Sequence, residues 1–69
     1  MNHKDAEAYN NRGLAYYENH DFPKAISDFT KAIEINPNYA EAYNNRGSVY
    51  AEQNDLIPKI YLSVVNFIT

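Results

Sequence analysis

The side chains that most often carry out chemistry in proteins are few in this sequence and stand apart. The two histidines, His3 and His20, have no carboxylate at a metal-ligand spacing from both. The chain has no cysteine, which excludes disulfides, thiolate zinc sites and a cysteine nucleophile. No motif would activate the hydroxyls of Ser27, Ser48 or Ser63, and no glycine-rich loop would hold a phosphate. We therefore predict a protein without catalytic residues, without a metal site and without a cofactor.

Seven tyrosines offer a second kind of chemistry, the stacking of bases of single-stranded nucleic acid. Most of them recur at one fixed offset along the chain, which favours a role in helix packing. The formal net charge of −3 also lacks the basic surface that nucleic acids and anionic membranes attract. We predict neither a nucleic-acid partner nor a membrane partner.

The length of the chain and its apolar segments indicate how many domains it has and whether it enters a membrane. A chain of 69 residues allows one small domain, residues 1–69. The polar residues 1–5 lead into no apolar segment of a signal peptide. The longest apolar-rich stretch, 57–69, is interrupted by polar residues and is shorter than the roughly 20 apolar residues that span a bilayer. We therefore expect a cytoplasmic protein.

The strongest pattern is an internal repeat. The eight residues Ala6–Gly13 recur without a change as Ala40–Gly47, at an offset of 34 residues. Looser agreement continues as far as Asp21 and Asp55. Eight consecutive identities at one offset do not arise by chance, and a period of roughly 20 to 50 residues is typical of stacked repeats.

One period of the repeat predicts two helices. The first helix carries its packing stripe at spacings of three and four, at Ala8, Tyr9, Gly13 and Tyr16. The turn formers Asn19-His20-Asp21 end it, and Asp21 and Pro23 suit the first turn of a second helix. That helix has an apolar side and ends at Asn36-Pro37-Asn38, because proline cannot continue it. Gly13 and Ala25 are expected where the two helices cross closely.

These residues resemble the tetratricopeptide repeat family. The resemblance rests on Tyr9-x2-Arg12-Gly13-x2-Tyr16, followed by Ala25-x3-Phe29, Ala32 and Pro37. It implies an all-α fold of tandem helix-turn-helix repeats in a right-handed superhelix, an α-solenoid, with repeat 1 at about 6–39 and repeat 2 at about 40–69. It also implies no catalysis and a concave groove, lined by the first helix of each repeat, that binds peptides or partner proteins.

The candidate groove residues lie on the two first helices. They are Glu7, Asn10, Asn11, Leu14, Tyr17, Glu41, Asn44, Asn45 and Ser48. Asparagine is a mediocre helix former, so the two asparagine pairs are unexpected in the middle of a helix. Their amides either bond a peptide backbone, which they can do in either polarity, or bridge adjacent helices or face water. We expect a groove of neutral to acidic character.

The second repeat departs from the pattern after Asp55. One extra residue near Ile57 restores the alignment of the apolar positions, and a turn after residue 53 would then lead into a second helix. The segment 57–69 is rich in β-branched residues, and part of it also fits a period of two, so a strand is the alternative to a helix. As a helix, it would be apolar on both faces.

An apolar end without a polar capping helix predicts self-association, because stacked repeats normally need about three units and a cap. The self-association candidates are Ile57, Tyr61, Leu62, Val65 and Ile68, and a dimer is the expected assembly. The sequence thus predicts a non-catalytic module that binds a peptide or partner protein through the concave face of its first helices. The alternative is a structural unit that homo-oligomerises through its apolar C-terminal segment.

Overall fold

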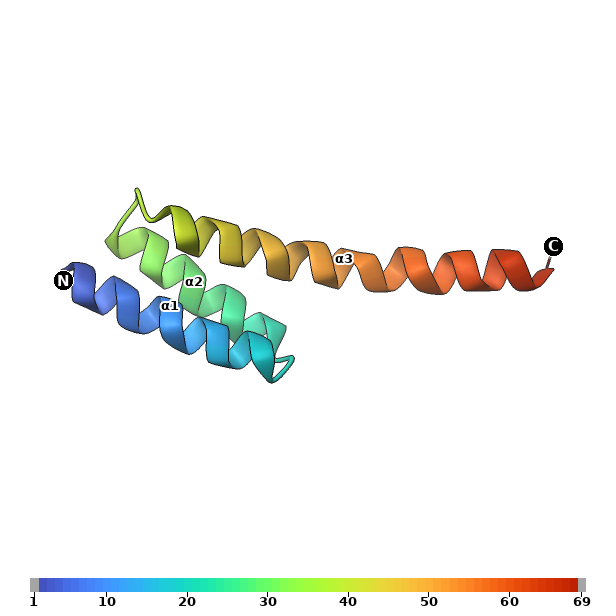
Figure 1. Ribbon diagram of the computed structural model, residues 1–69, viewed down its shortest axis with the longest axis horizontal. Coiled ribbons are helices and arrows are strands. Elements are labelled where there is room, and N and C mark those ends of the chain that lie inside the picture. The colour runs from blue at the N-terminus through green and yellow to red at the C-terminus, as the bar shows by residue number, and fades with distance from the viewer. Residues whose placement is uncertain (1, 69) are drawn as a thin grey trace.

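The computed structural model describes the backbone of residues 2–68 and the side chains of residues 2–54, and over this range it contains three helices and no strand. Helix α1 spans His3–Glu18, α2 spans Phe22–Ile35 and α3 spans Ala40–Ile68 (Figure 1). Helices α1 and α2 form a hairpin, and the first part of α3 packs along α2. The rest of α3 extends past both, so the molecule is 55 Å long and 13 Å thick. The predicted all-α fold is confirmed.

Helix α1 begins with a capping box. The Asn2 side chain accepts hydrogen bonds from the backbone N–H groups of Lys4, at 2.9 Å, and Asp5, at 3.2 Å. The Asp5 carboxylate accepts from the Asn2 N–H at 3.2 Å. Three backbone N–H groups at the start of the helix are thereby paired with side chains, which fixes the start of α1.

The turn between α1 and α2 is made by His20 and Asp21. His20 has a φ of 63°, in the left-handed region, and its N–H donates to the carbonyl of Tyr17 at 2.9 Å. The Asp21 N–H donates to the carbonyl of Tyr16 at 2.8 Å, which completes a Schellman turn. The Asp21 carboxylate then accepts from the Lys24 N–H at 3.3 Å and caps α2. The predicted turn and cap are confirmed.

Two small clusters form the core, where α2 meets α1 and α3. One consists of Ala6, Ala32 and Ala42, and the other of Ala25, Phe29 and Val49, all fully buried. The Phe29 ring lies against Gly13, where an added Cβ would stand 2.6 Å from a ring carbon. Gly13 therefore permits the close crossing of α1 and α2 that the sequence predicts.

The prediction of a second hairpin after residue 53 is wrong, because α3 runs as one helix from Ala40 to Ile68. The prediction that segment 57–69 is helical is confirmed as far as Ile68, and the strand alternative is wrong. The side chains of the self-association candidates Ile57, Tyr61, Leu62, Val65 and Ile68 lie outside the residues whose side chains are described.

A difference of one residue in spacing explains the missing turn. The cap of α2 uses the N–H of Lys24, three residues after Asp21. Three residues after Asp55 stands Pro58, which has no N–H to donate. Asp55 therefore cannot accept a hydrogen bond from the N–H three residues on, as Asp21 does. In addition, Gln53, a better helix former, replaces the asparagine that ends α1.

Candidate interaction surfaces

Helices α1 and α3 are joined by a pair of asparagines. The Asn45 side-chain N–H donates to the side-chain oxygen of Asn10 over 3.0 Å. Asn10 is only 1% exposed, so its amide is not accessible to a ligand. Of the roles that the sequence leaves open for the asparagines, Asn10 and Asn45 take the one of bridging two helices.

Tyrosine hydroxyls and glutamate carboxylates flank this asparagine bridge. Burial raises the pKa of Tyr39, and the negative charges of Glu41 and Glu7 raise it further. On the other side of the bridge along α1, hydrogen bonding to the Glu52 carboxylate, together with burial, raises the pKa of Tyr17. Carboxylates from both α1 and α3 therefore gather on this side of the molecule.

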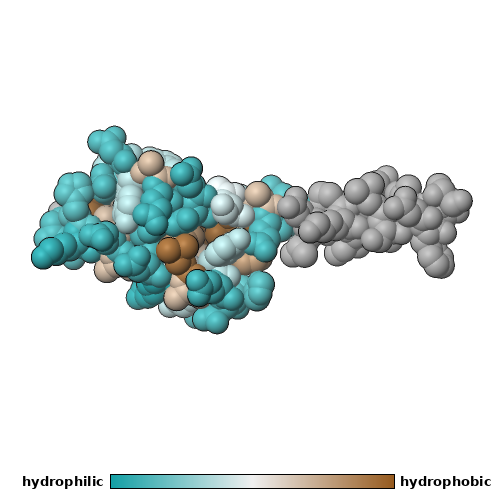
Figure 2. All heavy atoms as spheres, in the orientation of Figure 1, coloured by the Kyte–Doolittle hydropathy of each residue, from teal (hydrophilic) through white to brown (hydrophobic). Residues whose placement is uncertain are grey.

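Most of the predicted groove residues reach solvent. Glu7, Asn11, Glu41, Asn44 and Ser48 are exposed, and Leu14, Tyr17 and Asn45 are half-buried. Together with Glu52, these eight residues are named the α1/α3 face. Within it, the Ser48 hydroxyl donates to the Asn44 carbonyl of its own helix at 3.0 Å. The side of the molecule seen in Figure 2 is mostly hydrophilic, with a small apolar patch in the middle of its described part.

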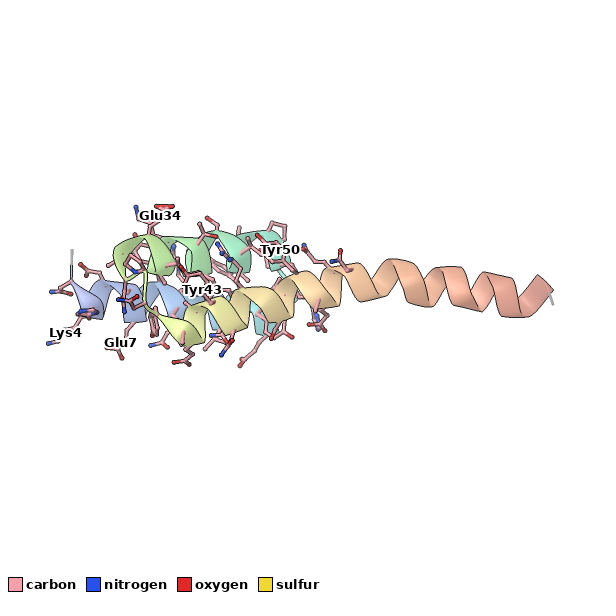
Figure 3. All side chains as sticks on the ribbon, turned by 90° about the horizontal axis from the view of Figure 1, so that it is seen from above. Lys4, Glu7, Glu34, Tyr43 and Tyr50 are labelled. Carbon is pink, nitrogen blue, oxygen red and sulfur yellow. The ribbon has the colours of Figure 1, made fainter. Side chains whose placement is uncertain are left out.

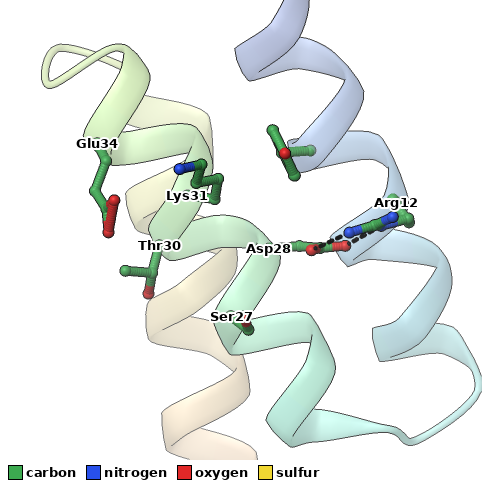
Figure 4. Close-up of a pocket in the computed structure, with 7 residues that line it drawn as sticks. Arg12, Ser27, Asp28, Thr30, Lys31 and Glu34 are labelled. Carbon is green, nitrogen blue, oxygen red and sulfur yellow. Dashed lines mark hydrogen bonds and ion pairs between the residues drawn. The ribbon is translucent and has the colours of Figure 1, made fainter.

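An ion pair between α1 and α2 is a feature that the sequence analysis missed. Arg12 donates two hydrogen bonds, of 2.7 and 2.9 Å, to the Asp28 carboxylate (Figure 4). Its guanidinium lies over the rings of Tyr9 and Tyr16, 5.6 and 5.8 Å from their centroids. Hydrogen bonding to Asp28 and its charge raise the pKa of Arg12. A signal was present, because Asp28 is the acidic residue on the otherwise apolar side of its helix.

The ion pair lines an open depression of about 440 Å³ between the two helices (Figure 4). Its lining residues are Tyr9, Arg12, Ser27, Asp28, Thr30, Lys31 and Glu34. Arg12 and Asp28 satisfy each other, and the two other charged residues of the lining, Lys31 and Glu34, carry opposite charges, so the depression has no net charge to attract a ligand.

The octapeptide Ala6–Gly13 recurs in α3 as Ala40–Gly47, where its side chains have different neighbours. Arg46 donates to the Thr30 hydroxyl at 3.0 Å and lies over the Tyr43 ring, and no carboxylate of the side chains described pairs with it. Tyr43 and Tyr50 are 43% and 44% exposed (Figure 3). A Cβ added to Gly47 would meet no described atom within 4 Å. Tyr43, Arg46, Gly47 and Tyr50 are named the open α3 face.

Neither surface contains the elements of a metal site. Among the residues with described side chains, no three histidines or carboxylates come close enough together to hold a metal ion. Over that same part of the chain, no helix combines the length and the apolar character that crossing a membrane requires.

Comparison with known proteins identifies the repeat. Two family models, both described as tetratricopeptide repeat, match the chain, one over residues 6–39 and the other over residues 29–57. The matched ranges together contain α1 from residue 6 onward, all of α2 and the first part of α3. No solved structure matches the chain.

Proposed function

Because the chain belongs to the tetratricopeptide repeat family, whose repeats generally mediate protein–protein interaction, we propose that it binds a peptide or partner protein through the α1/α3 face. The family is typically a non-catalytic interaction module, and we propose the same for this chain. A cytoplasmic location and the absence of a cofactor and of a nucleic-acid partner remain predictions from the sequence.

The observation that carries the proposal is the bond between Asn10 and Asn45. It holds α1 and α3 together, and the exposed residues Asn11 and Asn44 are the sequence neighbours of the two bonded asparagines. Each of these amides offers both donors and an acceptor, so they can bond a peptide backbone. Since both helices are formed before binding, their backbones lose no conformational freedom when a peptide binds.

The charge of the α1/α3 face favours a basic partner. Glu7, Glu41 and Glu52 contribute carboxylates, and none of the residues that define the face is a lysine or arginine. Complementary charge speeds the encounter and selects the partner more than it raises the affinity. We therefore propose a peptide with lysine or arginine near its centre.

Fluorescence anisotropy with two sets of short peptides tests this proposal. The sets share one sequence frame and carry either lysine or glutamate at the same positions. We expect saturable binding of the lysine set, weakened about fivefold or more by Glu7→Gln, as for loss of a charge partner at an interface. The double variant Asn11→Ala, Asn44→Ala should also weaken it.

The matched control is Glu34→Gln, which removes the same charge from an exposed residue of α2 outside the α1/α3 face. We expect it to leave the affinity nearly unchanged. Equal losses for Glu7→Gln and Glu34→Gln, or a preference for the glutamate set, would contradict the proposed face.

Homo-oligomerisation through the C-terminal segment is a second candidate, favoured by the extension of α3 past α1 and α2 (Figure 1). In a helix, the candidates Ile57, Tyr61, Val65 and Ile68 share one side, because their spacing is three or four residues. Light scattering behind size exclusion should show a dimer that Leu62→Asp with Val65→Asp abolishes. A monomer at every concentration would contradict this candidate.

A further inference from the structure

The open α3 face repeats, residue for residue, a face of α1 that α2 fills. On α1, the Phe29 ring packs against Gly13 and the Asp28 carboxylate bonds Arg12. On α3, the equivalent glycine and arginine are Gly47 and Arg46, and neither has such a neighbour among the side chains described. The chain therefore presents one filled and one unfilled copy of the same helix-binding surface.

Two properties of the open α3 face point to a ligand. Glycine is a poor helix former, and at Gly47, unlike Gly13, no close approach within the described structure requires it. The second property is charge. Arg46 is held by one neutral hydroxyl, that of Thr30, whereas its counterpart on α1 holds a carboxylate through two charge-assisted bonds.

The contacts on α1 define what the occupant must carry. It is a helix with a small residue, an aspartate and a phenylalanine at the spacing of Ala25, Asp28 and Phe29, all three buried against their neighbours. The small residue lets the helices approach, the ring fills the space over the glycine, and the carboxylate pairs with the arginine.

The sequence of residues 55–69 does not contain that pattern. The alignment with one extra residue matches Ala25, Asp28 and Phe29 to Ile60, Ser63 and Val64. This second set has no small apolar residue, no carboxylate and no aromatic ring at the corresponding positions. The α2 of a second copy has the pattern, but its Asp28 and Phe29 are already buried. A second copy would have to open its own hairpin to supply them.

We infer that the open α3 face binds a helix of another protein in which a small residue, an aspartate and a phenylalanine follow the spacing of α2. The partner helix lies along α3 as α2 lies along α1, with its aspartate on Arg46 and its phenylalanine on Gly47. This surface lies apart from the α1/α3 face and does not depend on the function proposed for that face.

The probe is a peptide with residues 21–38 of this chain and the substitution Ser27→Glu, held helical by a lactam that joins the new side-chain carboxyl to the Lys31 amine with loss of water. We expect saturable binding to the full chain, measured by anisotropy. Gly47→Leu and Arg46→Gln in the chain should each weaken binding about tenfold or more, as should Asp28→Asn in the peptide. Asp28→Asn in the peptide should cause no further loss of affinity for the Arg46→Gln chain, because the two changes remove the same ion pair.

Three controls separate binding from folding and from the other surface. The Gly47→Leu chain should keep its circular dichroism and melt no lower than the native chain, because the new side chain begins in open space and leucine is the better helix former. Glu34→Gln in the peptide and Asn44→Ala in the chain should leave the affinity unchanged. The latter change belongs to the α1/α3 face, so the two proposals fail independently.

Equal affinity of the helical peptide for the native and Gly47→Leu chains would overturn the inference, as would no binding at all. A chain that dimerises without peptide and loses the dimer on Gly47→Leu would assign the open α3 face to a second copy. That result would also overturn the assignment to a foreign helix.

Discussion

The identical octapeptides of α1 and α3 differ in every neighbour that decides their role. In α1, Gly13 is covered by a phenylalanine ring and Arg12 is bonded to a buried carboxylate. In α3, Gly47 is open and Arg46 reaches only a threonine hydroxyl. The difference arises outside the octapeptides, because one is followed by a capped turn and a returning helix and the other is not.

This contrast shows that a repeat is completed by its turn as much as by its helix-packing residues. The sequence Asp21-Phe22-Pro23-Lys24 caps α2, whereas Asp55-Leu56-Ile57-Pro58 places proline where the capping N–H should be. One inserted residue thus converts the start of a second hairpin into the interior of a long helix. The surface that the hairpin would have covered is left open.

The largest expected effect comes from deletion of Ile57. Removal of this residue restores the order aspartate, apolar residue, proline, lysine, and so returns an N–H to the capping position. We expect α3 to break near residue 54 and the chain to fold back. Small-angle scattering should then report a longest dimension clearly shorter than that of the native chain, whose Cα atoms extend over 55 Å.

Deletion of Leu62 is the matched control, since it also shortens α3 by one residue but leaves Asp55 and Pro58 at their native spacing. Equal shortening by both deletions would mean that capping geometry does not decide where α3 ends.

The two glycines should respond to alanine with opposite signs. Gly13→Ala places a methyl group 2.6 Å from the Phe29 ring, and overpacking of this kind destabilises by about 1–3 kcal/mol. Gly47→Ala places it in open space and should stabilise the chain by up to about 1 kcal/mol through helix propensity. Urea unfolding followed by circular dichroism measures both. A loss of stability at both positions would show that Gly47 also lies in a tight contact.

The first hairpin could be predicted because each of its signals is local. The stripe of α1, the turn at His20 and the cap at Asp21 all depend on residues within a few positions of one another. The second hairpin was predicted wrongly because alignment of apolar residues tolerates an insertion, whereas a hydrogen bond to one backbone N–H does not. Long-range contacts were harder still. Both the Asn10–Asn45 bridge and the Arg12–Asp28 pair join residues 16 or more positions apart.

A smaller pair of opposite effects is expected where α1 ends and α3 continues. His20 adopts a φ of 63°, a conformation that costs glycine nothing, so His20→Gly should stabilise by about 0.5–1 kcal/mol. Its counterpart Asn54 lies inside α3, where Asn54→Gly should destabilise by about 0.3 kcal/mol. The same urea experiment compares them. Stabilisation by glycine at residue 54 would indicate that the chain turns there in solution.

The smallest expected effect is a pH dependence to which Tyr17 of α1 contributes and its counterpart in α3 does not, because that counterpart is Ala51. Tyr39, whose pKa is also raised, contributes over the same pH range in every variant compared. Hydrogen bonding to Glu52 raises the pKa of Tyr17 above its ordinary value of about 10. The folded chain therefore keeps a proton that the unfolded chain has lost, and the free energy of unfolding falls as the pH rises above about 10. Urea midpoints measured across this range should fall less steeply for Tyr17→Phe, and also for Glu52→Ala, which removes the acceptor of the hydrogen bond that is the main cause of the shift. Slopes unchanged in both variants would show that the hydroxyl of Tyr17 does not bond Glu52 across the α1/α3 face.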